Sequence, residues 1–336
     1  MRGEKRGILA RRVLLPLFPV LCGIAALCVG RMGVTPADLG RSVLGHLTGG
    51  ELPSGLIELT LWRVRLPRIL LAMLTGAGLS VSGCAFQSLF SNPLATPDTL
   101  GVASGASFGA ALGILIGLPL IGVEGMAMLF GVAAVLLTSL AGQGRGGLSG
   151  VVLAGIMMGS LFNALVSLVK YTADTETQLP AITYWLMGSL GAANWSELAL
   201  GAPPILIGVT VLLLLRWRLN LLPLTDEEAK AAGVNIRLLR TVTVIAATLC
   251  TASCVSMCGQ VGWVGLLIPH ICRMQFGSNH LRLLPASVFL GAGFLVIVDT
   301  AARTVTASEI PISILTAMIG APFFIFLMRR SEGWQL

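Results

Sequence analysis

Long apolar stretches separated by short polar segments run along almost the whole chain. No charged residue occurs between positions 145 and 170, 240 and 273, or 309 and 329. A helix needs about 20 consecutive apolar residues to cross the hydrocarbon core of a bilayer. The pattern therefore predicts an all-α, polytopic membrane protein whose residues 1–336 form one membrane domain. About ten transmembrane helices are expected, at 13–30, 66–90, 99–118, 120–142, 148–169, 198–216, 238–258, 261–273, 283–302 and 310–328.

Composition supports this class and the distribution of basic residues orients it. The chain is 55% hydrophobic and 11% charged, whereas soluble domains carry about 25% charged residues. Ten spans place both termini on one side, and 15 of the 22 lysines and arginines then fall on that side. Because cytoplasmic loops are enriched in basic residues, both termini are predicted to be cytoplasmic. The same rule accounts for the net charge of +7.

The segment 13–30 is expected to be a retained span, since no cleavage site follows it. The apolar piece 181–193 is too short to span and is expected to lie at the interface or to re-enter.

A dense polar segment, TDEEAKAAG, lies at residues 225–233. Thr225 followed by Glu228 matches a capping box, in which both side chains satisfy free N–H groups at a helix start. Gly233 can adopt the left-handed conformation that ends a helix. The topology places this segment in a cytoplasmic loop, 219–240. We therefore predict a short helix, defined at both ends, that is presented to a partner.

Two patterns in the second half of the chain leave alternatives open. Cys250, Cys254 and Cys258 would share one helix face, where small packing residues are the favoured interpretation and a soft-metal site is the alternative. In the segment 259–265 (GQVGWVG) every third residue is glycine. This spacing predicts a bare strip on one helix face, for packing against a neighbour, or else a flexible element beside a pathway. Pro269 is expected to interrupt the following helix.

Motifs for enzymatic chemistry are missing from the sequence. No G-x-x-x-x-G-K-[ST] loop occurs, and none of the three lysines lies in a glycine-rich segment, so the chain is not expected to bind ATP through a Walker motif. H-E-x-x-H, G-x-S-x-G and C-x-x-C motifs are also missing. His270 follows Pro269 near the end of a span, where a capping or packing role is expected. No catalytic residue and no metal site are predicted.

Ionisable side chains also give little support to an ion-driven carrier. Such carriers place carboxylates or histidines at mid-membrane depth. Asp299 and Arg303 come closest, but they lie four residues apart near the outer end of a span and can pair with each other. Sodium sites built from backbone carbonyls stay open. An ion-coupled secondary transporter or channel is therefore the alternative function, and a membrane-embedded enzyme comes third.

The segment 76–110 (GAGLSVSGCAFQSLFSNPLATPDTLGVASGASFGA) resembles the signature segment of FecCD-type permeases, which serve ABC importers of iron–siderophores, haem and cobalamin. Further matches continue in order over about residues 60–330. They include RLPR at 65–68, LAG at 153–155, YWLMG at 184–188, GWVGLLIPH at 262–270, HLRLLP at 280–285, DTAAR at 299–303, EIP at 309–311 and GAPFF at 320–324. Each match alone is weak, but their order and spacing make the resemblance specific.

The resemblance implies a ten-helix permease in the cytoplasmic (inner) membrane of a prokaryote. Its implied partners are a second permease copy or a paralogue, two ABC ATPase subunits and an extracytoplasmic substrate-binding protein. The chain itself would bind no cofactor, because ATP and Mg belong to the ATPase. The expected cargo is a metal chelate, with a ferric siderophore first and haem or cobalamin next. The sequence does not distinguish among these, nor between a homodimer and a heterodimer.

Residue roles are implied where the motifs match. The residues matching the ATPase coupling loop are Leu224, Thr225, Asp226, Glu227, Glu228, Ala229, Ala232 and Gly233. Arg65, Arg68 and Arg303 match outer arginines that dock acidic residues of the binding protein, with interfacial anchoring as the alternative. Asn92, Pro93 and Leu94 match a constriction at the inner mouth, with an ordinary Asn-Pro turn as the alternative. The segment 146–150 (GGLSG) lacks the polar, basic character expected of the family's inner gate, so that assignment stays open.

Overall fold

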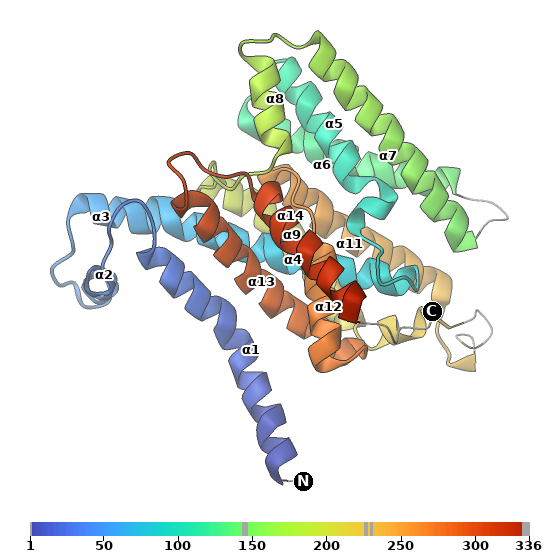
Figure 1. Ribbon diagram of the computed structural model, residues 1–336, viewed down its shortest axis with the longest axis horizontal. Coiled ribbons are helices and arrows are strands. Elements are labelled where there is room, and N and C mark those ends of the chain that lie inside the picture. Colours follow the sequence, from blue (N-terminus) through green and yellow to red (C-terminus); the bar gives the residue numbers. More distant parts are fainter. Residues whose placement is uncertain (1, 143–146, 225–227, 229–230, 331–336) are drawn as a thin grey trace.

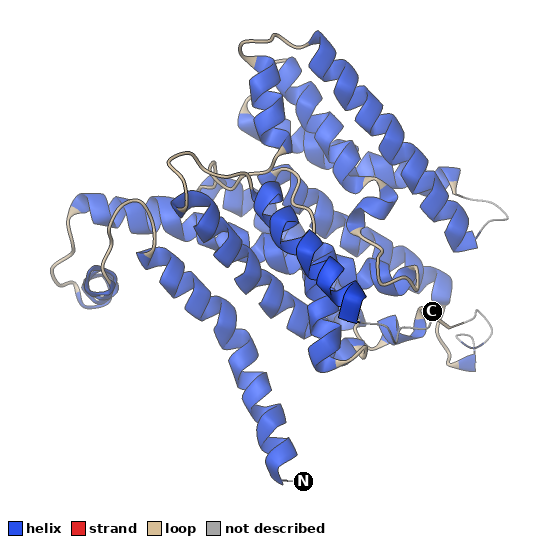
Figure 2. Cartoon of the chain, viewed as in Figure 1, coloured by secondary structure: helices blue, strands red, loops and turns tan. Residues whose placement is uncertain are grey.

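The structure is a computed structural model that describes residues 2–142, 147–224, 228 and 231–330 (Figure 1). These residues form helices joined by short loops, and no strand occurs among them (Figure 2). The helices are α1 (Arg2–Cys28), α2 (Pro36–Thr48), α3 (Gly55–Leu59), α4 (Leu66–Leu89), α5 (Val102–Leu115), α6 (Leu120–Ala141), α7 (Gly147–Thr172), α8 (Gln178–Leu186), α9 (Trp195–Leu215), α11 (Ile236–Cys258), α12 (Val264–Phe276), α13 (His280–Thr304) and α14 (Ile312–Arg330). The other helical segments are a π-helix, η1 (Thr60–Arg65), and two 3-10 helices, η2 (Pro97–Leu100) and η3 (Arg218–Leu221).

Each of the ten predicted spans coincides with a helix, which confirms the all-α membrane fold. Among the described residues, six helical segments are long and apolar enough to cross a membrane: 55–89, 120–141, 149–172, 195–215, 236–258 and 280–304. Shorter apolar helices cover 14–28, 102–115 and 312–326. The count of ten crossings and the cytoplasmic position of the termini stay predictions.

Helix α4 runs through the centre of the bundle, where α9, α11, α12 and α13 pack around it (Figure 1). Nearly all of its residues are buried. The sequence explains this position, because small and apolar side chains surround the helix on every face and no polar stripe is left for solvent. Ser80 and Ser82 fit this interior because their hydroxyls donate to the backbone carbonyls of Gly76 and Ala247.

Glycines allow the close approach of helices to α4. A Cβ atom on Gly83 would overlap the carbonyl oxygen of Gly265 in α12, and one on Gly76 would overlap that of Gly291 in α13. Small residues commonly mark such contacts in membrane bundles, because they let two backbones touch. The spacing of α4 from both neighbours therefore depends on these glycines.

Replacing Gly83 by Ala is expected to destabilise the chain by about 1–3 kcal/mol, because overpacking forces the α4 and α12 backbones apart. The matched control is Gly125→Ala in α6, where an added Cβ meets no heavy atom within 4 Å and alanine favours the helix. The measurement is the thermal unfolding midpoint of the detergent-solubilised chain. Equal midpoints for the two variants would contradict the close contact.

Helices α5, α6, α7 and α8 form a second group at one side of α4 (Figure 1). Alanines of α5 and α6, including Ala106, Ala110 and Ala127, fill the contact between these two helices. Gly109 permits the closest approach, since a Cβ there would overlap the carbonyl of Met126. This group borders the end of α11, and residues of both line a cavity that is described below.

Two helical predictions near residue 265 were wrong. The segment 259–263 is a loop and not a helix, because Gly259 ends α11 with a φ of 69° and Trp263 has a φ of 68°. The bare strip on one helix face is therefore not formed. Pro269 does not interrupt α12 but lies inside it. Its missing N–H leaves the carbonyl of Gly265 without its helical donor, and Gln87 Nε2 donates to that oxygen at 3.3 Å.

The sequence analysis did not predict helix α2. Its start is nevertheless encoded: Thr35 and Asp38 form a capping box, and Pro36 occupies the first helical turn. Gly49 ends the helix in the left-handed conformation, with φ 71°. These are recognisable start and stop signals. The segment was missed because it is too polar and too short to resemble a span.

Candidate functional site

Two carboxylates surround the guanidinium of Arg68 in α4. Arg68 Nη2 lies 2.9 Å from Asp299 Oδ1 of α13, and Nε donates to both oxygens of the same carboxylate. Arg68 Nη1 and Nη2 donate to the two oxygens of Glu309, each at 2.9 Å. The side chain of Asp299 is only 2% exposed. One guanidinium thus joins α4, α13 and the loop before α14.

Arg65 and Arg303 bind the end of α1. Arg65 donates to the carbonyls of Leu27 and Met32, and Arg303 donates to the carbonyl of Ala26. The last carbonyls of a helix have no partner within the helix, and cations are favoured there by the helix dipole. The two arginines therefore satisfy carbonyls that the last turn of α1 leaves without helical partners. We call Arg65, Arg68, Asp299, Arg303 and Glu309 together the arginine cluster.

The structure brings together the three arginines that the sequence assigned to docking. Arg65 is 4% exposed, and Arg68 and Arg303 are each 8% exposed. The expected Asp299–Arg303 pair is long, at 3.9 Å between Oδ2 and Nε, and Arg68 is the closer partner. Hydrogen bonds from Arg68 hold the pKa of Glu309 below its ordinary value. Docking stays a prediction, and it requires a partner to exchange some of these contacts.

The described part of the predicted coupling loop has the expected end. The N–H of Ala232 donates to the carbonyl of Glu228 at 3.0 Å, which is a helical hydrogen bond. Gly233 has a φ of 72°, so the predicted left-handed end is confirmed. Glu228, Ala232 and Gly233 are exposed, and Leu224 is half-buried. Thr225, Asp226, Glu227 and Ala229 lie outside the described residues.

Buried flanking residues hold this exposed turn in place. Leu219 and Leu222 are at most 1% exposed. The hydroxyl of Ser88, at the end of α4, donates to the carbonyl of Leu219 at 3.0 Å. Asn220 Oδ1 accepts the N–H of His280 at the start of α13, also at 3.0 Å. The loop is therefore attached to the same two helices that Arg68 joins at their other ends.

The residues assigned to an inner constriction form a compact exposed turn. Asn92 Oδ1 accepts the N–H of Leu94 at 2.9 Å, and the N–H of Ala95 donates to the Asn92 carbonyl at 3.1 Å. Asn92, Pro93 and Leu94 are all exposed, and Leu94 is 63% exposed. The side-chain hydrogen bond is that of an ordinary Asx turn. A constriction role stays a prediction.

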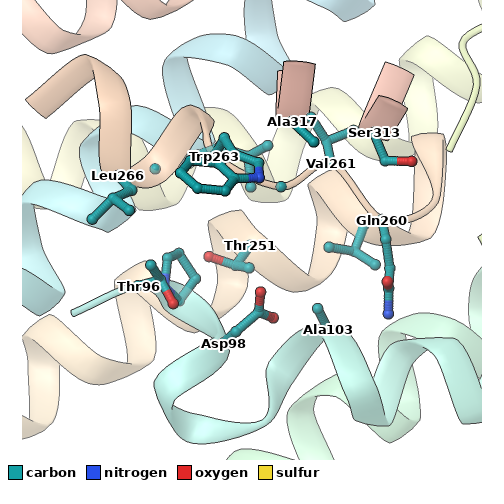
Figure 3. Close-up of a pocket in the computed structure, with 15 residues that line it drawn as sticks. Thr96, Asp98, Ala103, Thr251, Gln260, Val261, Trp263, Leu266, Ser313 and Ala317 are labelled. Carbon is teal, nitrogen blue, oxygen red and sulfur yellow. The ribbon is translucent and has the colours of Figure 1, made fainter. Parts of the chain in front are cut away.

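The glycine-rich loop at 259–263 lines a cavity of about 280 Å³ with both polar and apolar walls (Figure 3). Figure 3 shows the Asp98 carboxylate and the Thr251 hydroxyl on the side of the cavity that faces the Trp263 ring. Gln260 Nε2 donates to Ser107 Oγ at 2.7 Å and fixes one wall. Sequence reasoning singled out the glycine-rich segment but not the cavity, because Asp98 lies more than 150 residues away from it in the chain.

The aligned cysteines of α11 pack and hydrogen-bond within the bundle. Cys250, Cys254 and Cys258 are buried free thiols. Cys258 donates to the Cys254 carbonyl at 2.7 Å, and Cys254 donates to the Thr75 carbonyl at 3.7 Å. Among the described residues, no group of three or more His, Cys, Asp or Glu side chains is arranged to hold a metal ion. The packing interpretation agrees with these contacts.

Comparison with known proteins gives consistent similarities over nearly the whole chain. The profile of the FecCD transport family matches residues 17–330. The molybdate import system permease protein MolB of Haemophilus influenzae is 42% identical over 94% of both chains. A probable iron chelatin transport system permease of Helicobacter pylori is 36% identical over 87% of this chain and 89% of that protein. A solved inward-facing structure of a metal-chelate type ABC transporter has a TM-score of 0.86 and 40% identity. It covers 94% of this chain and 97% of that one.

Proposed function

The chain belongs to the FecCD transport family, and we propose that, as a permease of an ABC importer of metal chelates, it carries a ferric siderophore across the prokaryotic inner membrane. Haem and cobalamin are the next candidates. Similar permeases are named for molybdate, iron chelatin and hemin, so similarity alone does not select the cargo. A second permease copy or paralogue, two ATPase subunits and a substrate-binding protein complete the proposed transporter.

The observation that carries the proposal is the exposure of Glu228, Ala232 and Gly233 next to buried flanking residues. A transport chain without a phosphate-binding loop needs another protein to supply ATP energy. The preceding residues Leu219 and Leu222 are buried, and hydrogen bonds join Leu219 to Ser88 of α4 and Asn220 to His280 of α13. A force on the turn would therefore act on the two central helices. We assign residues 219–240 to contact with the ATPase, on the cytoplasmic side together with both termini.

The remaining predicted sites keep their proposed roles. Arg65, Arg68 and Arg303 would attract acidic groups of the binding protein, because a guanidinium keeps its charge and binds carboxylates through two hydrogen bonds. Asn92, Pro93 and Leu94 would narrow the inner mouth. The cavity beside Trp263 would border the path of the cargo, which corresponds to the second interpretation of the glycine-rich segment.

Reconstituted uptake tests this function. The chain is placed in vesicles with its partner ATPase and binding protein, and entry of a ferric siderophore is measured. Uptake is expected only with hydrolysable ATP and with all components present. A catalytically inactive ATPase variant is the control for leakage. Uptake driven by a sodium or proton gradient, without ATP or the ATPase, would instead support the ion-coupled secondary transporter or channel.

A further inference from the structure

A second cavity, of about 530 Å³, lies beside the arginine cluster. It is lined by Ile114 of α5, the start of α6, α8, the loop before α9, the end of α11 and Glu309. Its volume falls within the range of small-molecule sites, about 300–1,000 Å³. Most of its lining is apolar or aromatic and includes Tyr184, Trp185 and Met257. None of the described residues that line it is basic.

One carboxylate in this cavity has no partner. Glu124, one turn into α6, is 4% exposed, and its Oε2 atom makes no hydrogen bond. No salt bridge to Glu124 occurs among the described residues. Glu309 differs, because Arg68 binds both of its oxygens. A buried charge is costly unless it is paired, so Glu124 lacks the counter-charge that Glu309 has.

A second glutamate, outside the cavity lining, is also buried. Glu197, in the first turn of α9, is 8% exposed and does not line the cavity. Asn194 accepts the backbone N–H of Glu197, but no salt bridge to Glu197 occurs in the described part of the chain. The sequence analysis missed Glu124, although a carboxylate one turn into the predicted span 120–142 is a visible signal. The buried, unpaired carboxylate of Glu124 in the cavity wall favours a positive ligand.

The lining decides which positive ligand fits. Calcium takes six to eight oxygen ligands, and the described residues contain no group of three or more potential metal-binding side chains. An organic ammonium needs fewer polar contacts, since aromatic rings also attract cations, by about 0.5–2 kcal/mol. Tyr184 and Trp185 provide such rings beside apolar walls. We propose that this cavity binds an organic ammonium group, with Glu124 as its counter-charge.

In the transporter proposed above, the ammonium group would belong to the cargo, and this part of the inference rests on the proposed function. The cavity shares Glu309 with the arginine cluster, so a cargo held there would lie at the end of the bundle proposed to face the binding protein. A chelate with a free amine would then be held more tightly than the same chelate without it. The negative charge of Glu124 would disfavour binding of free oxyanions.

Calorimetric binding to the full chain in lipid nanodiscs tests the site. The probe is n-hexylammonium, compared with 1-hexanol, hexanoate and CaCl₂. We expect saturable binding of the ammonium only, weakened at least about tenfold by Glu124→Gln, or about 1.4 kcal/mol. Glu176→Gln, at an exposed carboxylate before α8, is the matched control and is expected to bind like wild type.

A second variant keeps the test decisive if Glu124→Gln does not fold. Tyr184 is 47% exposed, so Tyr184→Leu is expected to fold and to bind the ammonium several-fold more weakly. Equal affinity in wild type and in the available variants would overturn the proposal, as would equal binding of 1-hexanol. Saturable calcium binding that depends on Glu124 would assign an inorganic cation site and would also overturn it.

Uptake of two ferric chelates that differ only in a free or an N-acetylated terminal amine tests the link to cargo. The reconstituted wild type is expected to prefer the free amine, and Glu124→Gln is expected to lose this preference, so that its uptake ratio for the two chelates falls to about one. Equal ATP-dependent uptake of both chelates by wild type would refute the cargo assignment but leave the importer intact. Absence of ATP-dependent uptake would count against the importer, while the binding experiment would still decide the site.

Discussion

Replacing Glu228 by Arg and Ala232 by Trp together is expected to abolish ATP-driven uptake while the chain stays folded and inserted. Both residues are exposed on the turn that ends at Gly233, so the substitutions do not disturb the core. A reversed charge and a large ring on this surface would block contact with the ATPase. The uptake rate is expected to fall at least about tenfold, which corresponds to about 1.4 kcal/mol in an activation free energy.

Three measurements separate this effect from misfolding. Binding of the ATPase to the purified chain should be lost, transport-stimulated ATP hydrolysis should be lost, and the thermal unfolding midpoint should stay unchanged. The control carries the same substitutions on exposed residues near α2, Glu51→Arg with Ala37→Trp, and should bind the ATPase normally. Normal ATPase binding by the Glu228/Ala232 variant would show that the coupling surface lies elsewhere.

The sequence predicted the helices well because membrane spans are marked by length and hydropathy alone. All ten expected spans lie on helices, and the cap at Gly233 has the expected conformation. The prediction of a helix at 259–263 was wrong because glycine spacing is compatible with either a helix face or a turn. Contacts with the surrounding chain decide between these two conformations, since the Cβ of an alanine at 259 would overlap the carbonyl of Trp185.

The partners of charged side chains could not be read from the sequence to the same extent. Asp299 and Arg303 were expected to pair because they are four residues apart, but Arg68 is the closer partner from a distance of 231 residues. Likewise, the sequence identified Arg65 and Arg303 as candidate site residues, but their carbonyl partners at and after the end of α1 depend on how the helices pack. The cavity around Glu124 is lined by six separate segments of the chain, so no single sequence window contains it.

Replacing Asp299 by Leu is expected to destabilise the chain by about 3–5 kcal/mol, since a buried guanidinium loses its closest counter-charge. Arg68 would keep Glu309, but Arg303 would lose its nearest carboxylate. The double variant Arg68→Met with Asp299→Leu is expected to lose less stability than Asp299→Leu alone, because it removes the charge that would otherwise be left unpaired. The measurement is the thermal unfolding midpoint in nanodiscs, at one scan rate.

The surface pair Arg41–Asp38 gives the matched comparison. Its distance is 2.6 Å, but the Arg41 side chain is 65% exposed, and exposed pairs contribute about 0–1 kcal/mol. Arg41→Met is therefore expected to leave the midpoint nearly unchanged. A double variant less stable than Asp299→Leu would show that Arg68 stabilises the fold without its carboxylate. An unchanged midpoint for Asp299→Leu would show that water already compensates the charge, and the arginine cluster would then be free to bind a partner.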